Sequence, residues 1–377
     1  MTKRKMPRTL RRTMLRSAPL WMGLCAATLG VSVAEAQTKI STAAHGYPRV
    51  RKLSNGEVLV SGTAFGSSSI SIFSSTDEGV TFTKVGTITD SEFADGLCCG
   101  TIFVLPQAVG TLASGTILWA GSVGQNATDR RMKIKVYKST DNGRTWSYLS
   151  TAVTAPNTGG LWEPDFWIAN DGALVMAYSD ETLQGTYSQR LMKIRTYNGT
   201  SWVDGANMVA SSIQADRPGM AVVSKMASGT RFMTFELCGP AACTTFYKTS
   251  TDGWDWGAAT NVGSAIRLSD GRYFAHAPTN KVMPDGSLLV IGQMLMTSSN
   301  TVAAANGTVI FKSASGSPSG PWATIAAPVP VPGANNTPCI NYSSSLLPVA
   351  SGAQILEIAG KIDSGTCYLY FNRGSAN

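Results

Sequence analysis

Short apolar runs recur along the chain, separated by segments rich in glycine, serine, asparagine and aspartate. This pattern predicts β-strands, and almost no stretch has the 3.6-residue period of an amphipathic helix. One arrangement appears six times: an apolar run, a turn that ends in glycine, and a second apolar run. Because Asn-Gly, Asp-Gly and Ser-Gly turns need a positive φ, each copy predicts a tight β-hairpin. The six turn glycines are Gly56, Gly115, Gly172, Gly229, Gly286 and Gly352.

These hairpins are evenly spaced, at intervals of 59, 57, 57, 57 and 66 residues. A second pattern, Ser-x-Asp-x-Gly-x-Thr-Trp, interleaves with them in residues 74–82, 139–146 and 250–257, with weaker copies in 197–202 and 313–322. These segments are typical of Asp-boxes, which connect the third and fourth strands of a propeller blade. The aspartate accepts hydrogen bonds from backbone amides of its own turn, so we interpret the boxes as structural.

Six hairpins and five Asp-boxes predict an all-β fold, a six-bladed β-propeller of four-stranded antiparallel blades with Asp-box turns. The sixth repeat lacks a fourth strand after residues 367–372. We expect the segment near Lys39–Ala43 to supply that strand, because closing the ring removes exposed sheet edges.

The first 36 residues have the pattern of an export signal. Seven basic residues precede an apolar stretch that is short for a membrane span, and Ala34-Glu35-Ala36 resembles a cleavage site. Arg11-Arg12 favours the twin-arginine route, with an ordinary export signal as the alternative. We therefore expect a signal peptide in residues 1–36, a single catalytic propeller in 37–377, and a secreted or periplasmic protein.

Removing this leader changes the charge balance. The chain has 31 basic and 23 acidic residues; without the leader's seven basic residues and one acid, 24 and 22 remain. A nearly neutral mature chain gives no reason to expect binding to nucleic acid, or to a membrane once the signal is removed. We expect a monomer.

Six cysteines remain after the leader: Cys98, Cys99, Cys238, Cys243, Cys339 and Cys367. An even number in an exported chain favours disulfides, and spacing predicts the bridges Cys238–Cys243 and Cys339–Cys367. The adjacent pair either bridges to itself or pairs elsewhere. Only two histidines are present, so we expect no metal and no organic cofactor.

The propeller topology also predicts which residues share a face. In each blade the innermost strand starts at the rim where the second strand ends, so side chains at these two points lie together. The predicted face is rich in carboxylates, aromatic rings and hydrogen-bonding groups, which suits a carbohydrate. Its members are Tyr47, Arg49, Asp95, Cys98, Cys99, Trp162, Glu163, Asp180, Glu181, Asp216, Arg217, Glu236, His276, Gln293, Asn341 and Tyr342.

Two glutamates on this face lie among apolar residues, Glu163 in WEPDFW and Glu236 in MTFELCG. Burial raises the pKa of a carboxyl group, and glycoside cleavage needs a carboxylate pair, so both are candidate catalytic residues. Singly, each could equally be a structural carboxylate. We expect Asp216 and Arg217 to form an ion pair that orients a catalytic group. The candidate substrate-binding residues are Trp162, Asp95, Glu181, Asp216, Arg217, His276, Tyr342 and Arg49.

The segments GGLWEPDFW, YSDE, ADRPGM, FELCG and CINYSSSLLP resemble glycoside hydrolase family 93 over most of residues 45–373. The resemblance implies a secreted exo-α-1,5-L-arabinanase that releases arabinobiose from arabinan, or from a related plant polysaccharide, with retention. It implies that Glu163 is the acid/base and Glu236 the nucleophile, although the residues themselves leave these two roles open.

Two other functions share this fold. A sialidase needs an arginine cluster and a tyrosine nucleophile, whereas only Arg49 and Arg217 are assigned clearly to the predicted face. A non-catalytic carbohydrate-binding propeller would not need both glutamates. The exact sugar, its linkage, and endo or exo action depend on loops over the face, which the sequence pattern does not fix.

Overall fold

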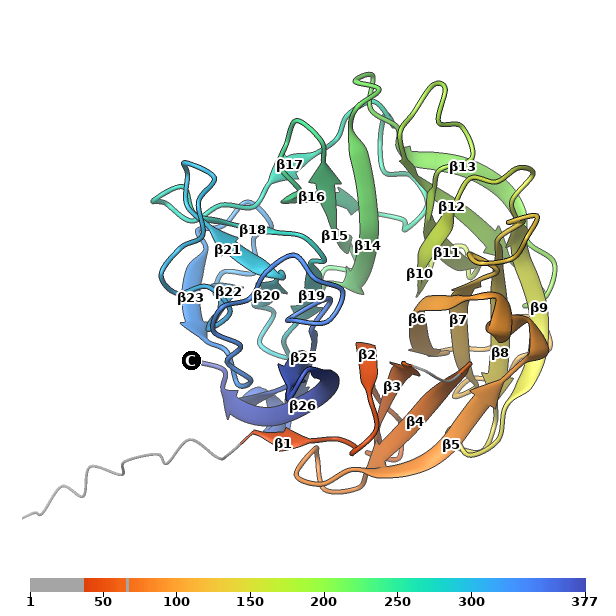
Figure 1. Cartoon of the computed structure of the whole chain (residues 1–377), viewed down its shortest axis with the longest axis horizontal. Helices are drawn as coiled ribbons and strands as arrows, with labels where there is room; N and C mark the ends of the chain where they lie inside the picture. Colours follow the sequence, from red (N-terminus) through yellow and green to blue (C-terminus); the bar gives the residue numbers. More distant parts are fainter. Residues whose placement is uncertain (1–36, 66–67) are drawn as a thin grey trace, which may run out of the picture. The chain divides into compact units, whose positions relative to one another are not determined.

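Figure 1 shows the computed structural model, which describes residues 37–65 and 68–377. The expected signal peptide lies outside the described residues. The described chain contains strands and two short 3-10 helices, η1 (Ser91–Asp95) and η2 (Ala350–Gly352), but no α-helix. Accordingly, the described part has no helix long and apolar enough to cross a membrane.

Six antiparallel sheets surround a central axis and confirm the predicted six-bladed propeller (Figure 1). Blade one contains β2 (His45–Lys52), β3 (Val58–Ala64), β4 (Ser69–Ser75) and β5 (Thr83–Thr89). Blade two contains β6 (Leu97–Val104), β7 (Ile117–Val123), β8 (Lys133–Ser139) and β9 (Ser147–Thr154). Blade three contains β10 (Leu161–Ile168), β11 (Leu174–Asp180), β12 (Arg190–Thr196) and β13 (Val203–Val209).

The remaining blades follow the same order from the axis outward. Blade four contains β14 (Arg217–Lys225), β15 (Arg231–Cys238), β16 (Thr244–Ser250) and β17 (Ser264–Ala265), extended by β18 (Tyr273–Ala275) and β21 (Met294–Met296). Blade five contains β19 (Thr279–Val282), β20 (Leu288–Ile291), β22 (Val309–Ser313) and β23 (Ala323–Ala326). Blade six contains β24 (Ser345–Val349), β25 (Gln354–Asp363), β26 (Thr366–Ser375) and β1 (Thr38–Lys39).

The predicted hairpin turns join the first and second strands of every blade. All six turn glycines have φ between 85° and 93°, a conformation that favours glycine over residues with a Cβ. The Asp-boxes lie between the third and fourth strands, as expected. In one of them the Asp141 carboxylate accepts hydrogen bonds from the backbone amides of Arg144 (3.2 Å) and Thr145 (2.9 Å). Arg144 also pairs with Glu57 of blade one at 3.0 Å, which ties this box to the neighbouring hairpin.

The hydrophobic core lies between neighbouring blades. One cluster, for example, joins Leu118 and Ile134 of blade two to Phe166 and Met176 of blade three. These side chains are almost fully buried. Each sheet therefore presents apolar side chains to both of its neighbours, and the ring of blades is held together by burial of this surface.

The first strand after the leader closes the ring, as predicted. Thr38 and Lys39 pair with Phe371 and Tyr370 of β26, and the Ile40 amide donates to the Leu369 carbonyl (2.9 Å). The strand itself is two residues long and begins at Thr38, slightly earlier than expected.

The disulfides follow the predicted pairs. Cys238 bridges Cys243, and Cys339 bridges Cys367. The adjacent residues Cys98 and Cys99 bridge to each other, which decides between the two alternatives that the sequence left open.

If closure contributes to stability, replacing Ile40 with alanine should lower the free energy of unfolding. The Ile40 side chain is buried in the cluster between blades six and one, and such truncations cost about 2–5 kcal/mol. Ile362 of β25 is a matched control because its side chain is 48% exposed; Ile362→Ala should change stability by about 0.5 kcal/mol or less. Denaturant unfolding of both variants checks this, and equal effects would contradict it.

Candidate active site

A ring of residues with left-handed backbone conformation marks one end of the innermost strands. None of them is a glycine, although this conformation is uncommon for residues with a side chain. They are Tyr47 (φ 52°), Cys99 (φ 61°), Glu163 (φ 57°), Met220 (φ 58°), Ala277 (φ 46°) and Ser343 (φ 57°). We call this set the bulge ring, because its members lie within or beside interruptions of strand pairing.

The pairing register shifts between Trp162 and Asp165 in blade three and between Gly219 and Val222 in blade four. Blades one and two have equivalent shifts. Such β-bulges change the direction of a side chain and leave backbone amides free of the ladder. Proline follows the ring residue in three blades, at Pro48, Pro164 and Pro278. Proline suits this position because it has no amide to contribute to the ladder.

Glu163 is the bulge residue of blade three. Its Oε2 accepts hydrogen bonds from the Ser179 hydroxyl (2.7 Å) and from the Met220 amide (3.2 Å). Burial raises the pKa of Glu163, while these two hydrogen bonds act in the opposite direction. The negative charge of Glu181 raises the pKa of Glu163, and the positive charge of Arg49 lowers it by a smaller amount. The Met220 amide is available because the bulge of the next blade frees it from the strand ladder.

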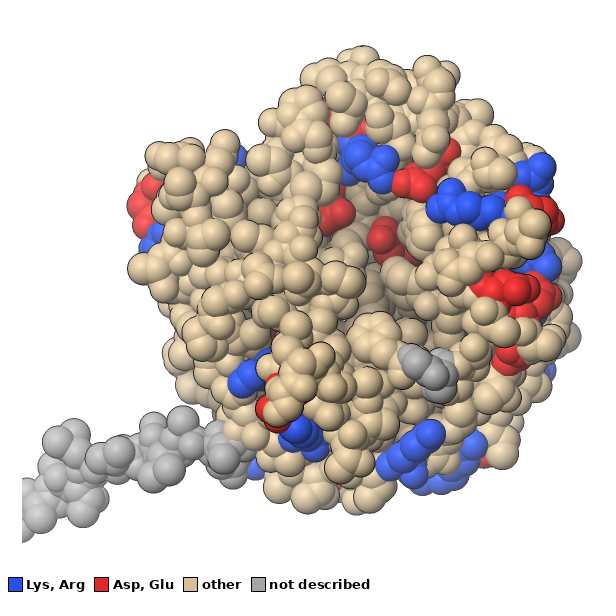
Figure 2. All heavy atoms as spheres, viewed as in Figure 1, with Lys and Arg blue, Asp and Glu red and all other residues tan. Residues whose placement is uncertain are grey.

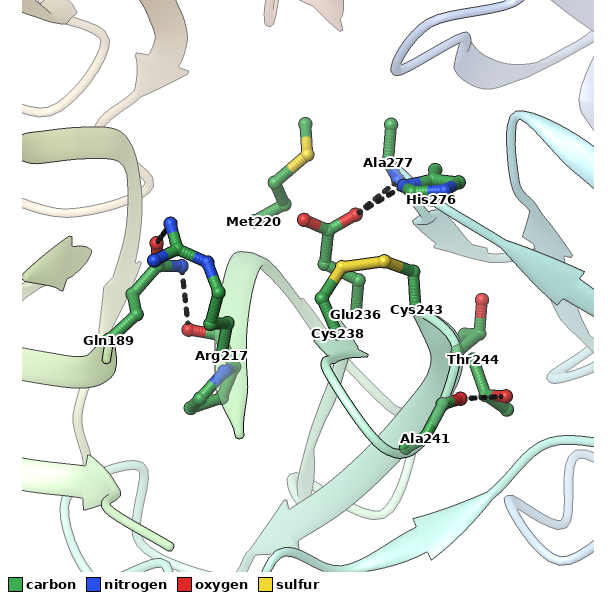
Figure 3. Close-up of a disulfide and its surroundings, with 12 residues drawn as sticks. Gln189, Arg217, Met220, Glu236, Cys238, Ala241, Cys243, Thr244, His276 and Ala277 are labelled. Carbon is green, nitrogen blue, oxygen red and sulfur yellow. Dashed lines mark hydrogen bonds and ion pairs between the residues drawn. A yellow bond between two sulfur atoms is a disulfide. The ribbon is translucent and has the colours of Figure 1, made fainter. Parts of the chain in front are cut away.

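Glu236 lies near the end of β15 in blade four. Its Oε2 accepts a hydrogen bond from the Ala277 amide (2.8 Å), which belongs to the bulge of blade five. The His276 Nδ1 is 3.9 Å from the same oxygen. Figure 3 shows the carboxylate directed toward these two residues, with the Cys238–Cys243 disulfide close by. Burial, followed by the negative charge of Glu163, raises the pKa of Glu236 to about 7.

Both glutamates line one cavity of about 330 Å³. Figure 2 shows a hollow at the centre of this face, with acidic side chains inside it and basic side chains at its edge near blades three and four. The lining residues are Arg130, Trp162, Glu163, Glu181, Gln189, Arg217, Glu236 and Cys238. The structure thus brings five of the predicted site residues together: Trp162, Glu163, Glu181, Arg217 and Glu236.

A chain of polar contacts holds one wall of the cavity. The Trp162 Nε1 donates to Glu181 Oε2 (3.0 Å), and Arg217 donates to Glu181 Oε1. Arg217 also donates to the Gln189 side chain (2.9 Å), and Gln189 donates to the Pro218 carbonyl (2.9 Å). The indole of Trp162 is therefore fixed as a side wall of the cavity.

The expected ion pair between Asp216 and Arg217 is not formed. Asp216 is buried and accepts a hydrogen bond from the Ser211 hydroxyl (2.5 Å), whereas Arg217 turns to Glu181. Asp216 lies in the turn before β14, where its amide donates to the Ile213 carbonyl (3.0 Å), whereas Arg217 is the first residue of the strand, and their side chains find different partners. Asp95 was also expected at the site, but it lines a separate surface pocket with Glu92 and Lys133.

Three further predicted residues lie beside the cavity without lining it. The Tyr342 hydroxyl donates to the Met220 sulfur (3.6 Å), and its ring lies 6.0 Å from that of Tyr47. Arg49 is buried and donates to the carbonyl and hydroxyl of Ser343. Burial lowers the pKa of His276, which disfavours the charged form of its ring.

Tyr342 and Tyr47 belong to an apolar cluster that includes both cysteines of the adjacent pair, Met220 and Ala277. Four members of the bulge ring and two of their sequence neighbours thus form an apolar patch beside the two carboxylates.

Sequence reasoning missed four residues that complete the site: Ser179, Arg130, Gln189 and Cys238. Ser179 is placed opposite Trp162 in the register between β10 and β11, which a correct strand alignment would have revealed. Arg130 and Gln189 lie in connections after the second strands of blades two and three, and their positions depend on loop conformation. Arg130 lies over the Trp162 ring at 5.9 Å and donates to the Thr158 carbonyl (2.6 Å).

One grouping among the described residues has the composition of a metal site: Cys238, Cys243 and His276 lie close together. Both sulfur atoms are used in the disulfide, so they are not thiolate ligands. The donor set therefore does not suit a metal in the oxidised protein.

No protein-family model and no curated protein matches this sequence. Solved structures do match its fold. The α-L-arabinanase of Penicillium chrysogenum, complexed with arabinobiose, is 22% identical with a TM-score of 0.76, and the match covers 90% of this chain and 97% of that one. The family 93 α-L-arabinofuranosidase of Fusarium graminearum, also with arabinobiose, is 21% identical with a TM-score of 0.76 over 90% and 97% of the two chains.

A Hadza microbial sialidase is more distant, at 15% identity and a TM-score of 0.59, covering 90% of this chain and 68% of that chain. These likenesses show that the chain has the propeller fold of the family 93 structures, as the sequence resemblance implied, and a more distant relation in fold to sialidases.

The electrostatic coupling of the two glutamates can be measured without a substrate. Glu236 should titrate near pH 7, and Glu163→Gln should lower its pKa because the nearby negative charge is removed. NMR titration of protein labelled with ¹³C at the glutamate carboxyls checks this, with Glu236→Gln identifying the signal. A midpoint near 4.3, the ordinary value for glutamate, or one unaffected by Glu163→Gln, would contradict the described coupling.

Proposed function

We propose that this protein is a retaining glycoside hydrolase that acts on the ends of α-1,5-L-arabinan, or of a related plant polysaccharide, and releases arabinobiose. The observation that carries the proposal is the carboxylate pair: Glu163 and Glu236 come from neighbouring blades, line one cavity and have raised pKa values. Two such groups are what glycoside cleavage requires, one protonated and one ionised.

The contacts favour Glu236 as the acid/base and Glu163 as the nucleophile, the reverse of the roles implied by the family resemblance. Glu163 accepts two hydrogen bonds that stabilise its anion, from Ser179 and Met220, and Arg49 adds a positive charge nearby. Glu236 accepts one hydrogen bond, from the Ala277 amide, and the negative charge of Glu163 disfavours ionisation of Glu236. When the pair holds one proton, that proton therefore resides on Glu236.

In the first step the ionised Glu163 attacks the anomeric carbon, and the bond from that carbon to the leaving oxygen breaks. Glu236 gives its proton to the leaving oxygen, so the remaining polysaccharide departs as an alcohol. In the second step the ionised Glu236 takes a proton from water, the water oxygen attacks the anomeric carbon, and Glu163 leaves as a carboxylate. Two displacements at the same carbon give net retention.

The size of the cavity and the nature of the structural neighbours support exo action on arabinan. A volume of about 330 Å³ is at the small end for ligand pockets, which suits the end of a chain better than an internal segment. Trp162 supplies an aromatic wall for a sugar ring, and Arg130 and Arg217 supply hydrogen-bond donors. Both family 93 neighbours were solved with arabinobiose.

The proposal includes export and removal of residues 1–36. The protein has three disulfides, and such bonds form and persist in oxidising compartments. The basic, then apolar, composition of the leader and its Ala34-Glu35-Ala36 end agree with that location.

Kinetics of glutamate variants test the catalytic roles. Glu163→Gln and Glu236→Gln should each lower kcat on linear arabinan by at least about a thousandfold, because both chemical steps need both groups. As pH rises through about 7, Glu236 loses its proton and kcat/KM of the wild type should fall. Glu78→Gln is the matched control, since Glu78 pairs with Lys52 outside the cavity and should keep wild-type activity.

Azide separates the two roles. In Glu236→Ala, azide should restore turnover of an activated aryl arabinoside and give a glycosyl azide with retained configuration, whereas Glu163→Ala should give the inverted azide. The opposite stereochemistry would exchange the roles, and full activity of both Gln variants would refute the catalytic pair.

A sialidase is the second enzyme function to test. The site offers little support for one: Arg217 is paired with Glu181, and burial raises the pKa of Tyr342, which disfavours a tyrosine nucleophile. Purified protein should release arabinobiose from linear arabinan and leave a sialic acid conjugate intact. Release of sialic acid alone would replace the proposal, and binding of arabinan with no cleavage would favour a carbohydrate-binding propeller.

A further inference from the structure

A second cavity, of about 230 Å³, lies on the propeller axis. All six innermost strands contribute to its lining, which is why it must lie at the centre of the ring. One lining residue from each blade is Arg51, Phe103, Phe166, Lys225, Lys281 and Ser345. It shares no lining residue with the cavity that contains the two glutamates. We call it the axial cavity.

The charges around the axial cavity are unbalanced. Its lining includes four basic residues, Arg49, Arg51, Lys225 and Lys281, and no acidic residue. Among the described residues, the acid that pairs with one of them is Asp165, whose Oδ1 lies 3.7 Å from Arg51 Nη2.

The Asp165 carboxylate already accepts hydrogen bonds from other donors. Its Oδ1 accepts a hydrogen bond from the Thr101 hydroxyl (3.1 Å), and its Oδ2 accepts one from the Val223 amide (2.8 Å). A single carboxylate shared in this way does not neutralise the several cations that surround the axial cavity.

Lys281 is an uncompensated cation. Among the described residues it has no hydrogen-bond or ion-pair partner, and the positive charge of Arg51 acts on it. Burial and the charge of Arg51 lower the pKa of Lys281 to about 7, and only Asp165 acts in the opposite direction. Arg51 and Lys281 are partly buried, and Arg49 adds a buried Nε that has no hydrogen-bond acceptor. Cations held together with limited access to water are costly unless an anion accompanies them.

We propose that the axial cavity is a binding site for a small inorganic anion, chloride or a tetrahedral oxyanion such as phosphate, held between Arg51 and Lys281. An anion would supply the acceptor that Lys281 lacks and a further counter-charge for Arg51, which already donates to the Val50 carbonyl (2.9 Å). It would also offset the charge that Asp165 leaves uncompensated. The cavity is large enough for one such ion with some water, and too small for a polysaccharide segment. This site would stabilise the ring of blades and is independent of the catalytic proposal.

Thermal unfolding at constant ionic strength and pH 6.5 tests the site. Sodium gluconate serves as the reference because its anion is bulky, and chloride and phosphate are titrated against it separately. The wild type should show a rise in Tm that grows with the logarithm of the anion concentration above Kd, about 5 °C at 100 times Kd, since a ligand that binds only the folded state shifts its stability by mass action. The salt that produces this logarithmic rise identifies which anion binds.

Variants distinguish a specific site from a general effect of salt. Lys281→Met should abolish the logarithmic rise while remaining folded, because it replaces an uncompensated cation with an apolar side chain of similar length. Lys84→Met is the matched control: Lys84 is exposed on β5 and does not line the cavity, so its variant should respond like the wild type. Equal responses of all three proteins, or no logarithmic rise in the wild type, would overturn the proposal.

A direct measurement covers the case in which Lys281→Met fails to fold. Wild-type crystals grown or soaked in sodium bromide should show an anomalous peak on the axis between Arg51 and Lys281, or phosphate density there after a phosphate soak. An axial cavity that holds only water under both conditions would refute the anion site. Arabinanase activity is not a readout in any of these experiments, so failure here leaves the catalytic proposal untouched.

Discussion

The functional site depends on one backbone feature, the interruption of strand pairing at the bulge ring. It places Glu163 in a left-handed conformation and releases the amides of Met220 and Ala277 from the strand ladder. Each freed amide donates to the carboxylate of the preceding blade, Met220 to Glu163 and Ala277 to Glu236. The geometry of the pair is therefore set by contacts between blades, and the strain of non-glycine residues with positive φ is maintained by the packing of the ring.

Near the axis of the propeller, charged side chains form two separate groups. Carboxylates lie in the cavity on one side of the bulge ring, whereas arginine and lysine side chains line the axial cavity. Arg49 connects the two groups, since it lines the axial cavity and its charge lowers the pKa of Glu163. Because Arg49 is buried, its charge interacts with Glu163 in a medium less polarisable than water and affects the protonation of Glu163 more strongly than a surface group would.

Much of the fold could be predicted from the sequence because its signals are local. A turn glycine needs its own φ, and an Asp-box aspartate binds amides within its own turn, so both can be recognised from a few consecutive residues. The two glutamates could be chosen because strand topology assigns them to one face. Residues in connections between strands, such as Arg130 and Gln189, were missed because the residues around them in sequence do not indicate that their side chains line the cavity.

The sequence by itself determined the number of blades, the closing strand near Thr38 and the two spaced disulfides, since each follows from repeat spacing or chemistry along one chain. Only the tertiary structure decided the partners of the charged side chains. Arg217 is adjacent to Asp216 in sequence but pairs with Glu181 of blade three, because the turn before β14 directs Asp216 to the Ser211 hydroxyl. Lys281 and Arg51 are far apart in sequence but line one axial cavity, because closing the ring brings all innermost strands to a common axis.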